Sequence, residues 1–394
     1  MTPNELEQLP KPTEYTMTAM EIAIMTEIVE RIKNAGEVTP LIDWTLSRLV
    51  TIGESKARMK KIINNALTDT DLRIDKIYEQ AIQSDYVVNK GIYQAVGLDY
   101  LPYQENKWLQ QAVEAMKAQT KDSLRPMENI TQTTGFNVKL GKETVFTPLS
   151  EYLEQTLDKS MMEIISGVKT YSQAIDGAID EMTSSGLRTM DYASGRSDRV
   201  EVAVRRAIMT GVGQLTDKVN EKNAKELNTD YWEVEWHMGA RNTGTGFMNH
   251  QNWQGKVYNS EEMKTVCGLG EMLGFAGINC YHIRFPFIPG ISKRKYTDEW
   301  LAEQNRKENT KRTFNGKEYD TYGAIQYQRK LERTIRKLKE DIKLLEKAKA
   351  DSEDISATKI RLRVASKAYT DLSKEMDIPQ QLERIRSTKT ASKQ

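Results

Sequence analysis

Apolar residues three and four positions apart recur along most of the first 228 residues, and this spacing is that of one face of an α-helix. The clearest example lies in residues 13–33 and consists of Ile22, Met25, Ile28, Val29 and Ile32. Similar patterns cover residues 40–49, 69–95, 102–126, 149–165 and 167–227. A chain patterned in this way buries its apolar faces by packing helix on helix, which predicts a helical body over residues 1–228.

Breaks in the pattern predict where these helices end. Asn34, Ala35 and Gly36 are expected to end the first helix, and residues 184–186 and 194–195 to separate helices within 167–227. Residues 131–147 are expected to form a loop or a short hairpin.

The organisation changes after Asn228. Residues 231–236 read Tyr-Trp-Glu-Val-Glu-Trp, and residues 231–291 contain many glycines and two prolines. Alternating aromatic and polar residues between glycines are typical of short strands and ordered loops. We therefore predict a compact α+β domain at 229–291.

The remaining residues, 292–394, are predicted to form a linker followed by a helical tail. After a polar stretch at 293–316, the apolar residues recur at spacings of four and three, as in a short heptad seam; they are Leu331, Ile335, Leu338, Ile342 and Leu345. About two heptads favour packing within the chain over a coiled coil with a partner. Another helix is expected at 360–376. The predicted fold class is mainly α, with a helical N-terminal region, a small compact α+β domain and a basic helical tail.

Length and composition indicate the size class of the protein and the compartment in which it is expected. The 394 residues exceed a single small binding module, and the mean hydropathy of −0.64 is that of a soluble chain. No apolar run approaches the roughly 20 residues that span a bilayer, and the N-terminus lacks a signal-peptide pattern. With only Cys267 and Cys280, no disulfide framework is expected, and we predict a reducing cytoplasm with no membrane contact.

The net charge of +1 conceals an asymmetry. Residues 292–394 hold 26 basic and 17 acidic residues, a net charge of +9, so residues 1–291 carry −8. A basic segment of this kind favours contact with nucleic acid or with an acidic protein surface, although charged helices are more often solvated.

Four residues of the 229–291 domain are candidate metal ligands: His237, His250, Cys280 and His282. Imidazole nitrogen and thiolate sulfur are the ligands of tetrahedral zinc sites. The pair Cys280 and His282 is closer in sequence than recognised zinc motifs, and the other two lie far upstream. The alternative is that the histidines donate hydrogen bonds to the backbone and that Cys280 is a small buried apolar residue.

Catalytic alternatives rest on the same residues. Cys280 as a nucleophile, with His237 or His250 as its base, would also require an oxyanion hole and a substrate cleft. A metal-dependent nuclease using Asn249, His250 and His282 would need an acidic ligand at a diagnostic spacing. The glycines at 268, 270 and 274 are not followed by the Lys-Ser/Thr of a phosphate-binding loop. We therefore predict no enzymatic activity and no catalytic residues.

Two segments resemble the minor capsid protein family of tailed phages of Gram-positive bacteria, which is distantly related to the Mu F-like head proteins. The first segment consists of residues 171–175, 191–196 and 204–211, and the second of 239–241, 250–258, 277–282 and 286–290. The positions that match are Tyr192, Gly195, Arg196, Arg205, Arg206, Gly211, Arg241, Trp253, Gln254, Gly255, Asn279, Pro286 and Gly290. Their expected role is structural. Gly255 and Gly290 can adopt positive φ. Arg205 and Arg206 could dock on a carboxylate or phosphate, but ion pairs on a helix surface are more common for such a pair.

The resemblance implies a structural minor capsid (head) protein present in few copies per particle. It associates the chain with the portal or the inner capsid and with DNA packaging or ejection. The implied partners are portal and capsid proteins of the same virion, with packaged DNA as a further contact of the basic tail. The implied location is the virion head, assembled in the cytoplasm of the bacterial host. The alternative is an effector enzyme delivered with the genome, a Cys/His or metal-dependent hydrolase or nuclease using residues 237–282.

Overall fold

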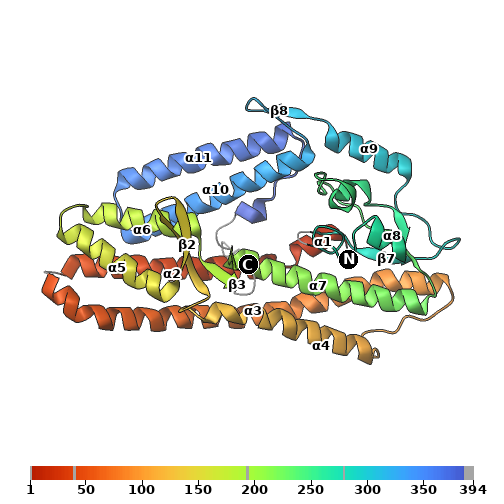
Figure 1. Ribbon diagram of the computed structural model, residues 1–394, viewed down its shortest axis with the longest axis horizontal. Coiled ribbons are helices and arrows are strands. Elements are labelled where there is room, and N and C mark those ends of the chain that lie inside the picture. Colours follow the sequence, from red (N-terminus) through yellow and green to blue (C-terminus); the bar gives the residue numbers. More distant parts are fainter. Residues whose placement is uncertain (1, 39–40, 192–194, 278–279, 386–394) are drawn as a thin grey trace, which may run out of the picture.

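Helix α2 (Lys11–Val38) lies at the centre of an elongated molecule whose long helices follow its longest axis (Figure 1). The computed structural model describes residues 2–38, 41–191, 195–277 and 280–385. The matched positions Tyr192 and Asn279 lie outside the described residues. Fully buried apolar side chains on more than one face of α2, including Ile24, Met25 and Val29, explain its central place. The helices α3, α5, α6, α7 and α10 pack around it.

The elements follow the sequence in a simple order. The helices are α1 (Pro3–Gln8), α2, α3 (Leu41–Ala95), α4 (Lys107–Asp122), α5 (Leu149–Ile165), α6 (Tyr171–Ser185), α7 (Val200–Glu226), α8 (Ser260–Thr265), α9 (Asp298–Asn309), α10 (Thr321–Ala348) and α11 (Ser352–Glu375). The strands are β1 (Thr134–Leu140), β2 (Glu143–Pro148), β3 (Arg188–Asp191), β4 (Arg196–Arg199), β5 (Tyr231–Val234), β6 (Val257–Asn259), β7 (Arg284–Phe287), β8 (Arg312–Phe314) and β9 (Lys317–Tyr319). The mainly α fold class with a small α+β region is confirmed. None of the described helices is both long and apolar enough to cross a membrane.

Two predicted helix boundaries were wrong. Helix α2 continues through residues 34–36 to Val38, and the helices expected at 40–49 and 69–95 form the single helix α3 of 55 residues, about 80 Å long. The weak helix former Gly53 costs only about 1 kcal/mol in a helix. Burial of Ile52, Met59 and Ile63 on the same helix outweighs that cost.

The body also contains a sheet that helical spacing did not predict. Its strand order is β2-β1-β3-β4, with all neighbours antiparallel. Residues 131–147 contribute the β1–β2 hairpin, one of the two alternatives expected, whereas the β3–β4 pair replaces part of a predicted helical stretch. Gly186 and Gly195, with φ of 67° and 65°, adopt backbone conformations that favour glycine before β3 and β4. These strands of four residues are too short to show a clear alternation.

The small α+β region is built on a second antiparallel sheet, of order β6-β5-β7. Its apolar core includes Trp232, Val234, Trp253, Met263 and Phe275. The sheet lies beside the C-terminal part of α7 at one end of the molecule (Figure 1).

The tail folds back onto the body. Helices α10 and α11 pack as a pair, with Ile335 and Leu338 against Ala365 and Tyr369, so the heptad seam is filled within the chain. Leu345 belongs to the main core of the body. The stretch at 293–316, predicted as a polar linker, instead contains α9 and strand β8, because Thr297 caps α9 and Asn315 and Gly316 turn the β8–β9 hairpin.

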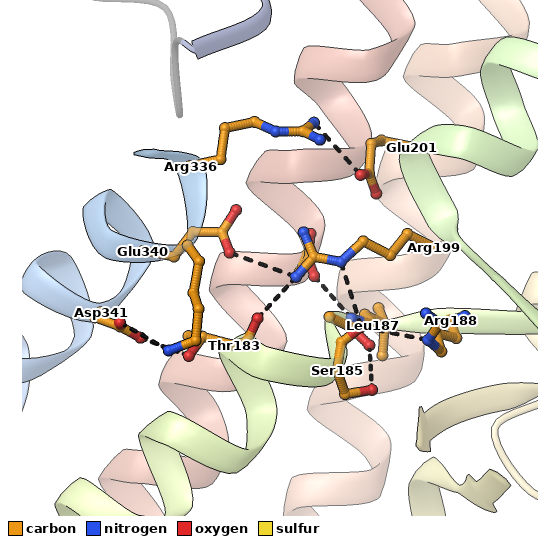
Figure 2. A network of polar contacts seen from close by, with 12 residues as sticks. Thr183, Ser185, Leu187, Arg188, Arg199, Glu201, Arg336, Glu340 and Asp341 are labelled. Atoms are coloured by element: carbon orange, nitrogen blue, oxygen red, sulfur yellow. Dashed lines mark hydrogen bonds and ion pairs between the residues drawn. The ribbon is translucent and has the colours of Figure 1, made fainter. Parts of the chain in front are cut away.

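A buried ionic cluster joins the tail to the body around Arg199, at the start of α7 (Figure 2). Its guanidinium donates to the carbonyls of Thr183 (2.8 Å) and Ser185 (3.3 Å), at the end of α6. It also lies 4.0 Å from the carboxylate of Glu340 on α10. Close by, Glu21 of α2 accepts a hydrogen bond from the backbone N–H of Leu187 (2.7 Å). Arg199 thus contacts the tail helix α10 as well as the end of α6.

Two buried carboxyls near Arg199, those of Glu340 and Glu21, have raised pKa values. Burial, followed by the charge of Glu21, raises the pKa of Glu340 to about 8, although Arg199 opposes this rise. Burial raises the pKa of Glu21 to about 7, with Arg199 again opposing and Glu201 adding to the rise. Above about pH 4.5 the folded chain therefore binds more protons than the unfolded chain, and these groups lose their stabilising effect as the pH rises to about 8.

Replacing Glu340 by glutamine should flatten this pH dependence. Between about pH 7 and 8.5 we expect the melting temperature of the unsubstituted chain to fall by about 2–4 °C, and that of Glu340→Gln to fall by less than half as much. The histidines contribute little in this range, because the pKa of an unfolded histidine, about 6.5, and the folded values of His237 and His250, lowered by burial to about 4, all lie below it. Differential scanning fluorimetry measures the effect. Glu346→Gln is the control, since Glu346 is half-exposed on the same helix and pairs with Lys359 (2.8 Å); an unchanged slope in Glu340→Gln would contradict the prediction.

Helix α7 packs closely on α3 and α4 at Gly211. A Cβ atom built there would lie 2.2 Å from Oη of Tyr78 and 2.3 Å from Oγ1 of Thr120. These two buried hydroxyls are 2.7 Å apart and hydrogen-bond to each other. Contact with α3 and α4 therefore leaves no room for a side chain at position 211.

Gly211→Ala should therefore destabilise the chain by about 1–3 kcal/mol, because an added methyl group overpacks the crossing. Gly213→Ala is a matched control on the same helix, where a Cβ atom would have no neighbour within 4 Å. Its better helix propensity should stabilise the chain by up to about 1 kcal/mol. Urea denaturation compares the two. Equal effects of both substitutions would show that helix propensity alone matters at Gly211.

Candidate metal centre

Three of the four predicted ligands converge in the small α+β region. His250 begins the 3-10 turn His250–Asn252, and Cys280 and His282 lie just before β7. One ligand atom from each of these residues lies within 4.8 Å of the other two. The fourth, His237, follows β5, and its ring lies 4.4 Å, centroid to centroid, from that of His282. The sequence named these four residues, and the tertiary structure groups three of them and places His237 beside His282.

The side chain of Gln254 fixes the protonation of His282. Oε1 of Gln254 accepts a hydrogen bond from the backbone N–H of His237 (3.1 Å), which identifies that atom as oxygen because an N–H can only donate. The same Oε1 lies 3.1 Å from Nε2 of His282, so Nε2 must carry the proton. Nδ1 of His282 therefore has a free lone pair, and it faces Sγ of Cys280 at 3.4 Å.

The other two histidines are held in the same way. Nε2 of His250 lies 2.9 Å from the carbonyl oxygen of Leu273, and Nδ1 of His237 lies 3.1 Å from that of Met238. A carbonyl only accepts, so each of these nitrogens is the donor and the other ring nitrogen is unprotonated. Nε2 of His237 is buried without a hydrogen-bond partner among the residues that the structure describes.

The electrostatics of the cluster keep all of these groups neutral. Burial raises the pKa of the Cys280 thiol to about 11 and lowers the pKa of His282 well below its ordinary value. A nucleophilic cysteine needs a thiolate stabilised by a positive neighbour, and here the neighbour is a neutral imidazole. Nor does a carboxylate join the group of His250, Cys280 and His282 in the described part of the chain. The arrangement therefore fits a ligand set better than the nucleophile or the nuclease considered above.

Trp253 packs against two of the candidate ligands, His250 and His282. Its indole is 1% exposed, its Nε1 donates to the carbonyl of Phe247 (2.9 Å), and its ring centroid lies 4.6 Å from those of His250 and His282. Gly255, with φ of 75°, follows it at a point where a Cβ atom would lie 2.5 Å from Leu301. Trp253 and Gly255, both matched by family resemblance, are thus closely packed against neighbouring side chains.

The remaining matched positions also lie in turns, strands and ion pairs. Arg206 pairs with Asp198 on the surface of α7, and Arg196 pairs with the same carboxylate (3.2 Å). Arg205 lines a 510 Å³ cavity between α7 and residues 269–284. Arg241 donates to the Leu273 carbonyl (3.0 Å). Pro286 lies in the edge strand β7, and Gly290 has a φ of 84°.

Arg284 is a structural residue that sequence reasoning missed. Its side chain is 3% exposed and donates to Asp217 (2.6 Å) and Glu221 (2.9 Å), both on α7. Its guanidinium also lies 4.1 Å from the ring centroid of Trp232. The available signal was a single arginine within the apolar run Ile283 to Phe287. This anchor fixes β7, and with it Cys280 and His282, against the body.

The chain is similar to known phage proteins. A family model described as phage minor capsid protein 2 matches residues 1–373. A structural protein of Lactococcus phage LL-H is 24% identical over 280 residues, which cover 67% of this chain and 71% of that protein. No solved structure matches the chain.

Proposed function

The chain belongs to the phage minor capsid protein 2 family, and from that premise we propose that it is a fixed, low-copy part of the phage head that docks on the portal or on the inner capsid. The family match over residues 1–373 carries this proposal, because it includes both the helical body and the small α+β region. Assembly would take place in the host cytoplasm. In this role the chain contributes contacts and rigidity rather than a reaction.

The docking surface that we assign lies where the start of α3 meets the end of α5. Five apolar side chains are exposed there: Leu49, Val50, Met162, Ile165 and Val168. The ion pair between Arg48 and Asp158 (2.6 Å) joins the two helices at this point. We call these five residues the α3–α5 patch. Exposed apolar side chains grouped in this way are typical of protein interaction sites.

The charges of the tail support a protein partner over DNA. Several basic residues of the tail pair with acidic residues of the body: Arg336 with Glu201 (3.4 Å), Lys337 with Asp180 (2.9 Å), and Arg384 with Glu7. The opposite net charges of the two parts of the chain thus partly neutralise each other inside the molecule. Contact between the tail and packaged DNA stays a prediction.

Quantitative mass spectrometry of purified virions tests the proposal. We expect a low, reproducible ratio of this chain to the portal and major capsid proteins, equal in DNA-filled and emptied particles. In the variant Met162→Glu/Val168→Glu, incorporation should fall at least about tenfold, since a loss of about 1.4 kcal/mol in docking already gives that factor.

Leu140→Glu is the matched control, because Leu140 is similarly exposed, at 62% against 65% for Met162, but lies on the β1–β2 hairpin. It should be incorporated normally. If the chain is absent from virions, or leaves the particle with the DNA, it is an assembly factor or a delivered effector and the proposal fails.

A further inference from the structure

The proposed docking role makes no use of the histidine cluster. All three histidines of the chain and one of its two cysteines lie together in the small α+β region. Each imidazole has one nitrogen hydrogen-bonded to an oxygen, which leaves the second nitrogen unprotonated. Metal-binding histidines are typically oriented in this way by carbonyl or carboxylate oxygens.

We propose that His250, Cys280 and His282 bind a structural zinc ion, with His237 as the fourth ligand. The inference is independent of where the protein lies in the particle. It rests on the positions of these side chains and of the groups that orient them.

The first argument is distance. Zinc lies about 2.3 Å from a thiolate and about 2.0–2.1 Å from an imidazole nitrogen, which places two such ligands about 3.5 Å apart in a tetrahedral site. Sγ of Cys280 and Nδ1 of His282 are 3.4 Å apart. The ligand atom of His250 lies within 4.8 Å of both, so a small inward movement completes three positions.

The second argument concerns the fourth position. Nε2 of His237 is buried and has no partner in the described part of the chain, which is costly for a polar atom. Its ring centroid lies 4.4 Å from that of His282, although His237 is not among the three residues whose ligand atoms all lie within 4.8 Å of one another, so its side chain must move inward to bind. A bound cation would satisfy this nitrogen. The site would then be closed by four protein ligands, as in structural zinc sites.

The identity of the ion follows from the ligands. One sulfur and three imidazole nitrogens, with no carboxylate in the described group, suit zinc and disfavour magnesium or calcium. Binding would replace the thiol proton of Cys280, which leaves to solvent, and no electron is transferred. The 510 Å³ cavity reaches Cys280 and His282 and provides an entry path.

Zinc would also stabilise the small α+β region, whose apolar core is limited. The small sheet consists of strands of three or four residues, and the ligands come from three separate segments: after β5, at residue 250 and before β7. An ion shared by these segments crosslinks them, as metals do in small domains with limited cores.

Metal analysis of the untagged full chain tests the proposal. After loading with zinc and removal of excess ion, we expect about one zinc per chain. Replacement by Co²⁺ should give the visible absorption of four-coordinate cobalt and a near-ultraviolet cobalt–thiolate band. Cys280→Ser should abolish that band, whereas Cys267→Ser, a buried thiol of the same region outside the ligand group, should retain it.

Gln254→Ala separates ligation from folding. Gln254 orients His282 without being a ligand, so the variant should fold and bind zinc about 10–100-fold more weakly. Circular dichroism verifies the fold of each variant. The cobalt–thiolate band of the unsubstituted chain provides a readout even if Cys280→Ser fails to fold. Absence of stoichiometric zinc in the unsubstituted chain, or zinc binding unchanged by Cys280→Ser and Gln254→Ala, overturns the proposal.

Discussion

The buried guanidinium of Arg199 is the interaction on which the arrangement of the long helices depends. It bonds the end of α6, begins α7, and faces Glu21 of α2 and Glu340 of α10. These four helices come from distant parts of the chain, between residues 11 and 348, so Arg199 joins segments that are far apart in sequence. A buried charge is costly without partners, and removing one partner leaves the others uncompensated. The cluster therefore selects one packing of the tail helix on the body.

The body and the small α+β region use different physical means of stabilisation. The body buries a continuous apolar core along α2, with polar clusters added at its crossings. The small region has a short sheet and a modest apolar core. It is further held by the hydrogen bonds of Gln254 and by the ion pairs of Arg284. A zinc ion among its histidines would extend that second strategy, because it crosslinks loops that few apolar contacts hold.

Membership of a phage minor capsid family offers one explanation for the long packed helices and the buried ion pairs. A part of a capsid must hold its shape while it contacts neighbouring proteins, and long helices locked by buried ion pairs provide such rigidity. The ion pairs between tail and body, such as Arg336 with Glu201 and Lys337 with Asp180, also hold the tail in place. We propose that the α3–α5 patch is the surface that contacts partner proteins.

The sequence by itself determined the helical class, the change of structure after Asn228 and the candidate ligands, because apolar spacing and residue chemistry are local properties. It also indicated that Ile335 and Leu338 pack within the chain. It could not determine the β3–β4 pair, whose short strands depend on β1, nor the union of two expected helices in α3. The convergence of His250 with Cys280 and His282, and the burial of Arg284 and Arg199, were decided only by the tertiary structure, since each joins residues far apart in the chain whose loop-closure cost no local pattern reveals.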